Sequence, residues 1–283
     1  MSLTEELLQG SIDMHIHHGP DARLERRVDA LQAALQAQEA GMRAIVLKSH
    51  DYPTAPVAYT VSQMVPDVAI FGSICLDLEV GGLNTVALEA SAKMGAKVVW
   101  MPTFTSANDM RKTGRNPEEG INLLDEEGKL VPVVHDILDI IKNYQMVLAT
   151  GHISVAESFA LVDEATKKGL PKIVITHPLL ERIGAHLTLD EQRQMVAKGA
   201  VIEHCFGITL PLQSRLDPMR IVEAVRAVGA EHVVMSTDLG QGWNPTPAEG
   251  MRMAIASMLK CGLTEKEIEL LVKINPAKLL DLD

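Results

Sequence analysis

The chain has 283 residues, and 47% of them are hydrophobic, which is enough for a large buried core. The formal net charge of −11 at pH 7 argues against nucleic acid and anionic membranes as partners, because neither attracts a net acidic protein. The three cysteines are odd in number and widely spaced, which indicates reduced core residues rather than a disulfide framework. The N-terminus is too polar for a signal peptide, and no apolar run reaches the roughly 18 residues of a membrane span, so we expect a soluble, cytoplasmic protein.

Short apolar runs rich in β-branched residues recur along the chain. They predict strands at residues 11–17, 43–49, 68–75, 97–101, 146–150, 172–176, 200–205 and 232–236. Amphipathic stretches between them predict helices, each ending at a glycine suited to a helix C-cap, at residues 28–41, 84–95, 155–169 and 218–229.

The order of these elements predicts the fold class. Several strands are continuous apolar runs, as expected of parallel strands that are covered on both faces. Eight strands with helical crossovers predict an α/β fold, a (β/α)8 TIM barrel, as a single domain over residues 1–283. The alternative is an open doubly wound sheet, but no GxGxxG motif follows a strand to support it.

The segment IDMHIHHGPD (12–21) carries three histidines, and two of them lie two positions apart at the end of the first predicted strand. Side chains at i and i+2 of a strand point to one face, so His15 and His17 project together. Further candidates follow the carboxyl ends of later strands: His50, His152, His177, His204 and Asp238. In a barrel these ends carry the active site, so we expect the side chains to gather there.

The chemistry that suits such a group is metal binding. Imidazoles and carboxylates are typical ligands of Zn²⁺, and Mn²⁺ and Fe²⁺ are alternatives. Water bound to such an ion is a nucleophile at neutral pH, and Asp238 is the candidate general base. His204 is expected to contact the substrate or to orient the water. Cys205 is rejected as a nucleophile, because neighbouring strand residues face opposite ways.

The pattern resembles the amidohydrolase superfamily of metal-dependent hydrolases, which are built on a (β/α)8 barrel. That superfamily carries HxH after strand one, a histidine after strand five, another after strand six and an aspartate after strand eight. The matching residues here are His15, His17, His152, His177 and Asp238. The stretch LTEKEIELLVKINPAKLLDL (263–282) resembles the superfamily's common ending, so the resemblance spans essentially the whole chain. It implies a divalent metal cofactor held by these five residues.

One position departs from the superfamily pattern. Two-metal members usually carry a bridging carboxylated lysine or a glutamate at the end of strand four, where this chain reads VVWMPTFTSAND (98–109). Either the site holds one metal, with His177 left to act as an acid–base or polarising group, or the bridge comes from elsewhere. Lys48 and Glu79 are the candidates for that bridge. Lys48 alternatively faces an anionic substrate or is a solvated strand end.

The longest connection, residues 104–132, follows the fourth strand and predicts an insertion over the site. Within it, INLLDEEGKLVP (121–132) predicts a small β-hairpin. Arg111 and Arg115 are candidates to hold a carboxylate or phosphate of the substrate, and a solvated basic loop is the alternative. Trp100 is a candidate for an apolar wall of the substrate site, although core packing explains it equally well. His50 is a candidate either for a substrate contact or for support of the ligands.

These observations predict a metal-dependent hydrolase that cleaves an amide, cyclic amide or lactone of a small molecule. A non-hydrolytic decarboxylase of the same superfamily is the first alternative, and a release assay for carbon dioxide separates the two. A non-catalytic metal-binding barrel is the alternative of a different class. A phosphoesterase ranks below these, since only the basic loop favours it. The sequence is compatible with a homo-oligomer.

Overall fold

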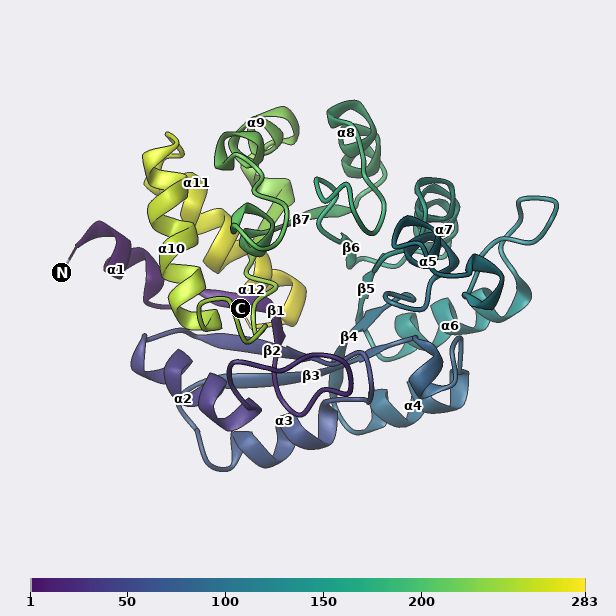
Figure 1. Ribbon diagram of the computed structural model, residues 1–283, viewed down its shortest axis with the longest axis horizontal. Coiled ribbons are helices and arrows are strands. Elements are labelled where there is room, and N and C mark those ends of the chain that lie inside the picture. The colour runs from purple at the N-terminus through teal and green to yellow at the C-terminus, as the bar shows by residue number, and fades with distance from the viewer. Residues whose placement is uncertain (1, 283) are drawn as a thin grey trace. The chain divides into compact units, whose positions relative to one another are not determined.

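The eight predicted strands are present in the computed structural model, which describes residues 2–282 (Figure 1). Each agrees with its predicted run to within one residue at either end. The strands are β1 (Ile12–His17), β2 (Ala44–Lys48), β3 (Ala69–Cys75), β4 (Ala96–Trp100), β5 (Val147–Ala149), β6 (Ile173–Ile175), β7 (Val201–Cys205) and β8 (Val233–Ser236). They form one sheet in the order of the sequence, and their registers are parallel. The predicted (β/α)8 TIM barrel is confirmed.

Helices connect the strands. They are α1 (Leu3–Leu8), α2 (Ala30–Glu39), α3 (Ala55–Ser62), α4 (Thr85–Lys93), α5 (Ala107–Lys112), α6 (Pro132–Asn143), α7 (Val155–Lys167), α8 (Leu189–Ala197), α9 (Pro218–Val228), α10 (Pro247–Lys260), α11 (Glu265–Glu269) and α12 (Asn275–Leu280). Capping boxes at Asp29 and Ser154 start α2 and α7, where each side chain accepts a backbone N–H of the first turn. The helix-ending glycines Gly41 and Gly169 have φ of 70° and 75°, as the C-cap pattern predicts. Within residues 2–282, none of these helices has the length and apolar character to cross a membrane.

The chain divides into two compact units. The first contains residues 2–49, 54–72 and 204–282, and in it α10 packs against α1 and α2. The second contains residues 50–53 and 73–203, and in it β4 to β7 pair in succession while α4 packs against α6. The prediction that residues 1–283 are a single domain stays a prediction.

In the first unit, β1 is flanked on both sides. It pairs with β2, and the register shifts between Asp13 and Ile16, so β1 has one residue more than its partner there. On its other side, Ile16 forms a parallel bridge with Leu239, just after β8. Bulges of this kind often re-aim side chains next to active sites. The shift therefore lies at the predicted ligand pair.

The insertion after β4 belongs to the second unit. It contains α5, the short helix η2 (Pro117–Glu119) and an antiparallel bridge between Leu124 and Leu130. The backbone N–H of Asp125 donates to the Lys129 carbonyl and closes the turn between them. The predicted hairpin over 121–132 is therefore present as a single bridged turn rather than as two strands.

Candidate functional site

In the first unit, the ends of β1 and β8 bring three predicted ligands together. The Nε2 atoms of His15 and His17 lie 3.2 Å and 3.0 Å from Oδ1 of Asp238. Ligands of a tetrahedral ion at bond lengths of about 2.0 to 2.1 Å stand about 3.3 to 3.4 Å apart, so this spacing fits one bound cation. All three side chains are buried, with Asp238 the most exposed at 9%. We call His15, His17 and Asp238 the first ligand group.

The backbone of the first ligand group is fixed by a buried carboxylate. Asp13 accepts hydrogen bonds from the backbone N–H of His15 and from both the N–H and the hydroxyl of Thr237. The N–H of Asp238 donates to the His15 carbonyl at 2.8 Å. Asp238 also has a φ of 55°, a left-handed conformation that is costly for a residue with a side chain and that clusters at functional sites. The fold thus holds this aspartate in a conformation that a free chain populates only sparsely.

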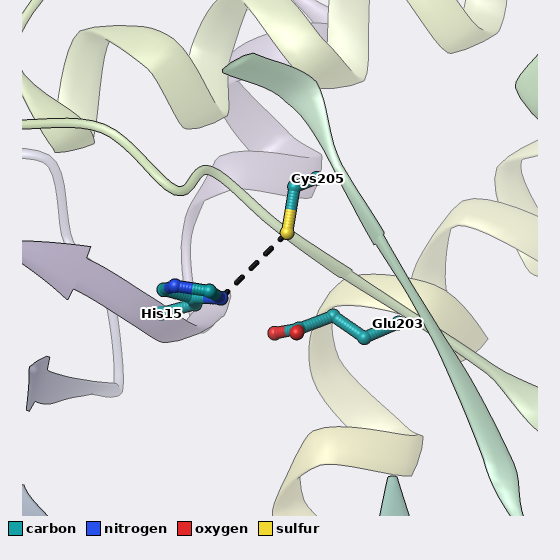
Figure 2. A group of neighbouring side chains, drawn as sticks. All are labelled: His15, Glu203 and Cys205. Carbon is teal, nitrogen blue, oxygen red and sulfur yellow. Dashed lines mark hydrogen bonds between the residues drawn. The ribbon is translucent and has the colours of Figure 1, made fainter. Parts of the chain in front are cut away.

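Two other side chains contact the His15 ring. The Lys48 Nζ lies 2.9 Å from its Nε2, and Lys48 is only 1% exposed. The Sγ of Cys205 lies 3.7 Å from the Nδ1 on the other side of the ring. Figure 2 shows the thiol of Cys205 pointing at His15, with Glu203 two positions earlier on the same strand. Lys48 therefore stands at the first ligand group, as its place at the end of β2 predicted.

The expected site contact of His204 is corrected by this geometry. Successive strand residues face opposite sides, so Cys205, which faces His15, leaves His204 on the other face of β7. His204 is 0% exposed, and within residues 2–282 neither of its ring nitrogens has a hydrogen-bond partner. Burial lowers the pKa of His204 to about 3, so the ring is neutral at physiological pH.

In the second unit, the ends of β5 and β6 bring His152 and His177 together. Their Nε2 atoms are 3.2 Å apart, a spacing that also fits two ligands of one cation. His177 has a φ of 28°, again a conformation rare for a residue with a side chain. The Nδ1 of His152 lies 2.9 Å from Oδ1 of Asp109, a buried carboxylate on α5. We call His152 and His177 the second ligand group.

His50 lies in the same unit and is held by a third buried carboxylate. Its Nδ1 lies 2.6 Å from the Thr103 hydroxyl and 3.3 Å from Asp77. The Thr103 hydroxyl donates its proton to Asp77, so its oxygen accepts from the N–H at Nδ1 of His50. The His50 ring stacks on Phe104, with centroids 4.0 Å apart, and its centroid is 6.5 Å from that of His152.

Both carboxylate oxygens of Asp77 accept hydrogen bonds from other protein groups. Besides His50 and Thr103, its Oδ1 accepts from the N–H groups of Thr103 and Thr105 and from the Thr105 hydroxyl. Burial alone raises the pKa of the Asp77 carboxyl, but the charge and hydrogen bonds of His50, Thr103 and Thr105 outweigh it and hold the pKa well below its usual range. The close grouping of His50, Cys75 and Asp77 is therefore better explained as an Asp–His pair than as a metal site.

The remaining predicted contacts lie apart from the ligand groups or have other partners. Arg115 donates to Oδ2 of Asp109 at 2.6 Å, which assigns it to a buried carboxylate rather than to a substrate. Arg111 is exposed on α5, and Trp100 is 1% exposed, as expected for core packing. Glu79 is exposed on the short helix η1 (Leu78–Val80), and its role as the bridging ligand stays a prediction.

Two functional candidates, Asp77 and Asp109, were not predicted from the sequence. Asp77 lies two residues after Cys75, the last residue of β3, so the strand-end rule applied to carboxylates as well as to histidines would have found it. Asp109 lies nine residues beyond Trp100, the last residue of β4, and it meets His152 only through the folding of α5. No local pattern in the sequence indicates that contact.

Among solved structures, the chain is similar in fold to several enzymes over nearly its whole length. It matches the probable dipeptidase PvdM from Pseudomonas aeruginosa at 14% identity and a TM-score of 0.69, covering 98% of this chain and 96% of that one. It matches an amidohydrolase from the same organism at 12% identity and a TM-score of 0.64, covering 98% of this chain and 97% of that one. It also matches 2,6-dihydroxybenzoate decarboxylase from Rhizobium at 12% identity and a TM-score of 0.62, covering 97% of this chain and 99% of that one. The predicted resemblance to the amidohydrolase superfamily is confirmed at the level of the fold.

Sequence comparison assigns the chain to one family. No curated protein matches the chain significantly. Residues 10–203 match the model of one protein family. The chain belongs to this family, whose description is "Family of unknown function (DUF6282)".

Proposed function

We propose that the protein is a metal-dependent hydrolase of small molecules. The observation that carries the proposal is the convergence of His15 and His17 on one oxygen of Asp238, at distances that fit ligands of a single cation. In this proposal the first ligand group holds one divalent ion and the second ligand group holds another. Zn²⁺ suits these imidazole and carboxylate ligands best, and Mn²⁺ and Fe²⁺ suit them as well.

A bound divalent ion supplies a water of lowered pKa and polarises the carbonyl of the substrate. The residues of the chain supply the proton transfers and the orientation. Asp238 takes the proton of the attacking water on its carboxylate and later returns it to the leaving group. His50 contacts the substrate, held in one ring orientation by Asp77 and Thr103. His177 acts as a ligand, and with one ion only it would be left to polarise the scissile bond.

The proposed substrates are amides, cyclic amides and lactones of small molecules. Decarboxylation is the second candidate, because β4 ends at Trp100 with neither lysine nor glutamate, and because a decarboxylase is among the similar structures. A panel of amide and lactone substrates is compared with a carbon dioxide release assay on aromatic acids. Hydrolysis with no release of carbon dioxide supports the first proposal, and the reverse result supports the second. A cytoplasmic location and homo-oligomers stay predictions.

Metal content tests the foundation of the proposal. We expect protein purified without added metal to contain divalent metal by elemental analysis. The double substitution His15→Ala and His17→Ala should remove the ion of the first ligand group and abolish turnover, because it deletes two of three ligands. His186→Ala, which alters a half-exposed histidine outside both groups, is the control and should keep the metal and the activity. Wild-type protein that binds no divalent metal would remove the basis of the proposal.

Lys48 gives a separate prediction about the missing bridging ligand. Its Nζ lies beside a ligand nitrogen, and a protonated amine there would repel a cation by several kcal/mol at an effective dielectric constant of about 20. We therefore propose that Lys48 binds the metal, as a carboxylated lysine. The Lys48→Met variant should lose metal and turnover together, which elemental analysis and the substrate assay measure. Tighter metal binding in Lys48→Met would show instead that Lys48 is a cation that opposes the metal.

A further inference from the structure

Helix α5 of the insertion and its N-cap residue Ser106 contact His152 at both its backbone and its ring. The Ser106 hydroxyl and the side-chain amide of Asn108 each donate to the His152 carbonyl at 2.9 Å. Asp109 lies 2.9 Å from the ring Nδ1. Three residues within four consecutive positions thus fix a single histidine, and each is at most 8% exposed.

The Asp109 contact sets which nitrogen of the ring carries the proton. An ionised carboxylate only accepts hydrogen bonds, so the Nδ1 of His152 must carry the hydrogen that it donates. The neutral ring then has its lone pair at Nε2, and this nitrogen lies 3.2 Å from the Nε2 of His177. A metal ligand needs this state, with a lone pair at the binding nitrogen and the other N–H held by a partner.

Arg115 balances the charge of the buried carboxylate. The Asp109 side chain is 1% exposed, and such a charge is costly without a partner. The guanidinium of Arg115 lies 2.6 Å from Oδ2, while Oδ1 remains directed at His152. The backbone N–H of Asp109 donates to the Ser106 hydroxyl, which caps α5 and orients the start of the helix. The insertion therefore builds an Arg115–Asp109–His152 series of contacts.

We propose that Asp109 is a positioning residue for metal binding at the second ligand group, and that Arg115 keeps it in place. The inference rests on the proposed metal-dependent function, because it concerns the affinity of His152 and His177 for the ion. The insertion predicted to cover the substrate would then control the metal affinity of the site. Loss of such a supporting partner typically weakens metal binding by about 10- to 100-fold.

The test measures metal affinity without turnover. Metal-stripped protein is titrated with Zn²⁺ against a competing chelator, for the wild type and for the variants Asp109→Asn, Asp109→Ala and Arg115→Ala. Asparagine can still accept from Nδ1 but lacks the charge, whereas alanine removes the acceptor. We expect weaker binding by about 10-fold or more for Asp109→Ala, with a smaller loss for Asp109→Asn and Arg115→Ala. The matched control is Arg111→Ala on the same helix, which should leave the affinity unchanged.

A second measurement separates this inference from the proposed function. In metal-free protein, ¹⁵N NMR of the histidine rings reports which nitrogen of His152 is protonated, with His152→Gln for assignment. The wild type should show the hydrogen at Nδ1, and Asp109→Ala should show a mixture of both forms. A wild type that binds no Zn²⁺ but shows this dependence of the ring proton on Asp109 would refute the metal function and leave Asp109 only as the residue that fixes the protonated nitrogen of His152. Unchanged affinity and an unchanged ring in folded Asp109→Ala would overturn the inference.

Discussion

Substitution of Asp238 by asparagine is expected to lower kcat by about 10³-fold or more. Proton transfer by a positioned side chain contributes about 10²- to 10⁴-fold to a rate, and Asp238 is proposed as both proton acceptor and metal ligand. Asparagine has nearly the same shape and keeps a carbonyl oxygen, so the hydrogen bonds around the position should persist. The measurement is the steady-state rate on the best substrate of the panel, with metal content and circular dichroism determined on the same sample.

A matched substitution separates the acid–base role from general damage. Gln241 donates to the backbone carbonyl of Asp238 through its side-chain amide, so Gln241→Glu, whose carboxylate only accepts, removes this hydrogen bond without altering the ligand oxygens. This variant should lose much less activity than Asp238→Asn. Retained turnover in metal-loaded Asp238→Asn would rule out Asp238 as the proton acceptor.

Acidification is expected to destabilise the protein through His204. The unfolded chain takes up a proton near pH 6.5, whereas the folded state resists it until about pH 3. The stability associated with the neutral ring is therefore complete above pH 6.5 and is lost as the pH falls through this window. The expected slope is up to about 1.4 kcal/mol per pH unit in the free energy of unfolding.

Comparison with His204→Leu isolates this contribution. Leucine fills the buried position and needs no hydrogen bond, so the variant should be at least as stable as the wild type at pH 8. Urea unfolding at pH 8, 6 and 5 should show the difference between the two proteins widening as the pH falls, while other titrating groups cancel. A constant difference would contradict the assignment. A folded His204→Leu variant without activity would restore the site role that the sequence predicted.

The strands and the first ligand group were predictable because their signals are local. Continuous apolar runs identify parallel strands, and the i, i+2 spacing of His15 and His17 places both rings on one face. Once the strand ends were known, Asp238 followed from the rule that barrel sites lie at carboxyl ends. The structure brings these three side chains within hydrogen-bond distance.

The same rules could not predict which residues of β7 point inward. The alternation of residues groups Glu203 with Cys205 and Ile202 with His204, but it does not say which pair faces inward. A strand buried on both faces has no polar side to decide the question, and β7 is buried from Ile202 to Cys205. The contact of Asp109 with His152 escaped for a different reason, since it spans 43 positions of sequence and depends on a helix packed against a loop.

The interleaving of the two units has a consequence for the order in which the chain can fold. His17 and Asp238 meet across 221 positions of sequence, and both belong to the unit that contains the first and the last described residues. Residues 73–203, which form most of the second unit, are synthesised before Asp238. Contacts of such long separation form late, because loop closure has to precede them. The HxH pair is therefore synthesised long before its carboxylate. A chain that terminates before Asp238 contains both histidines without their acid partner.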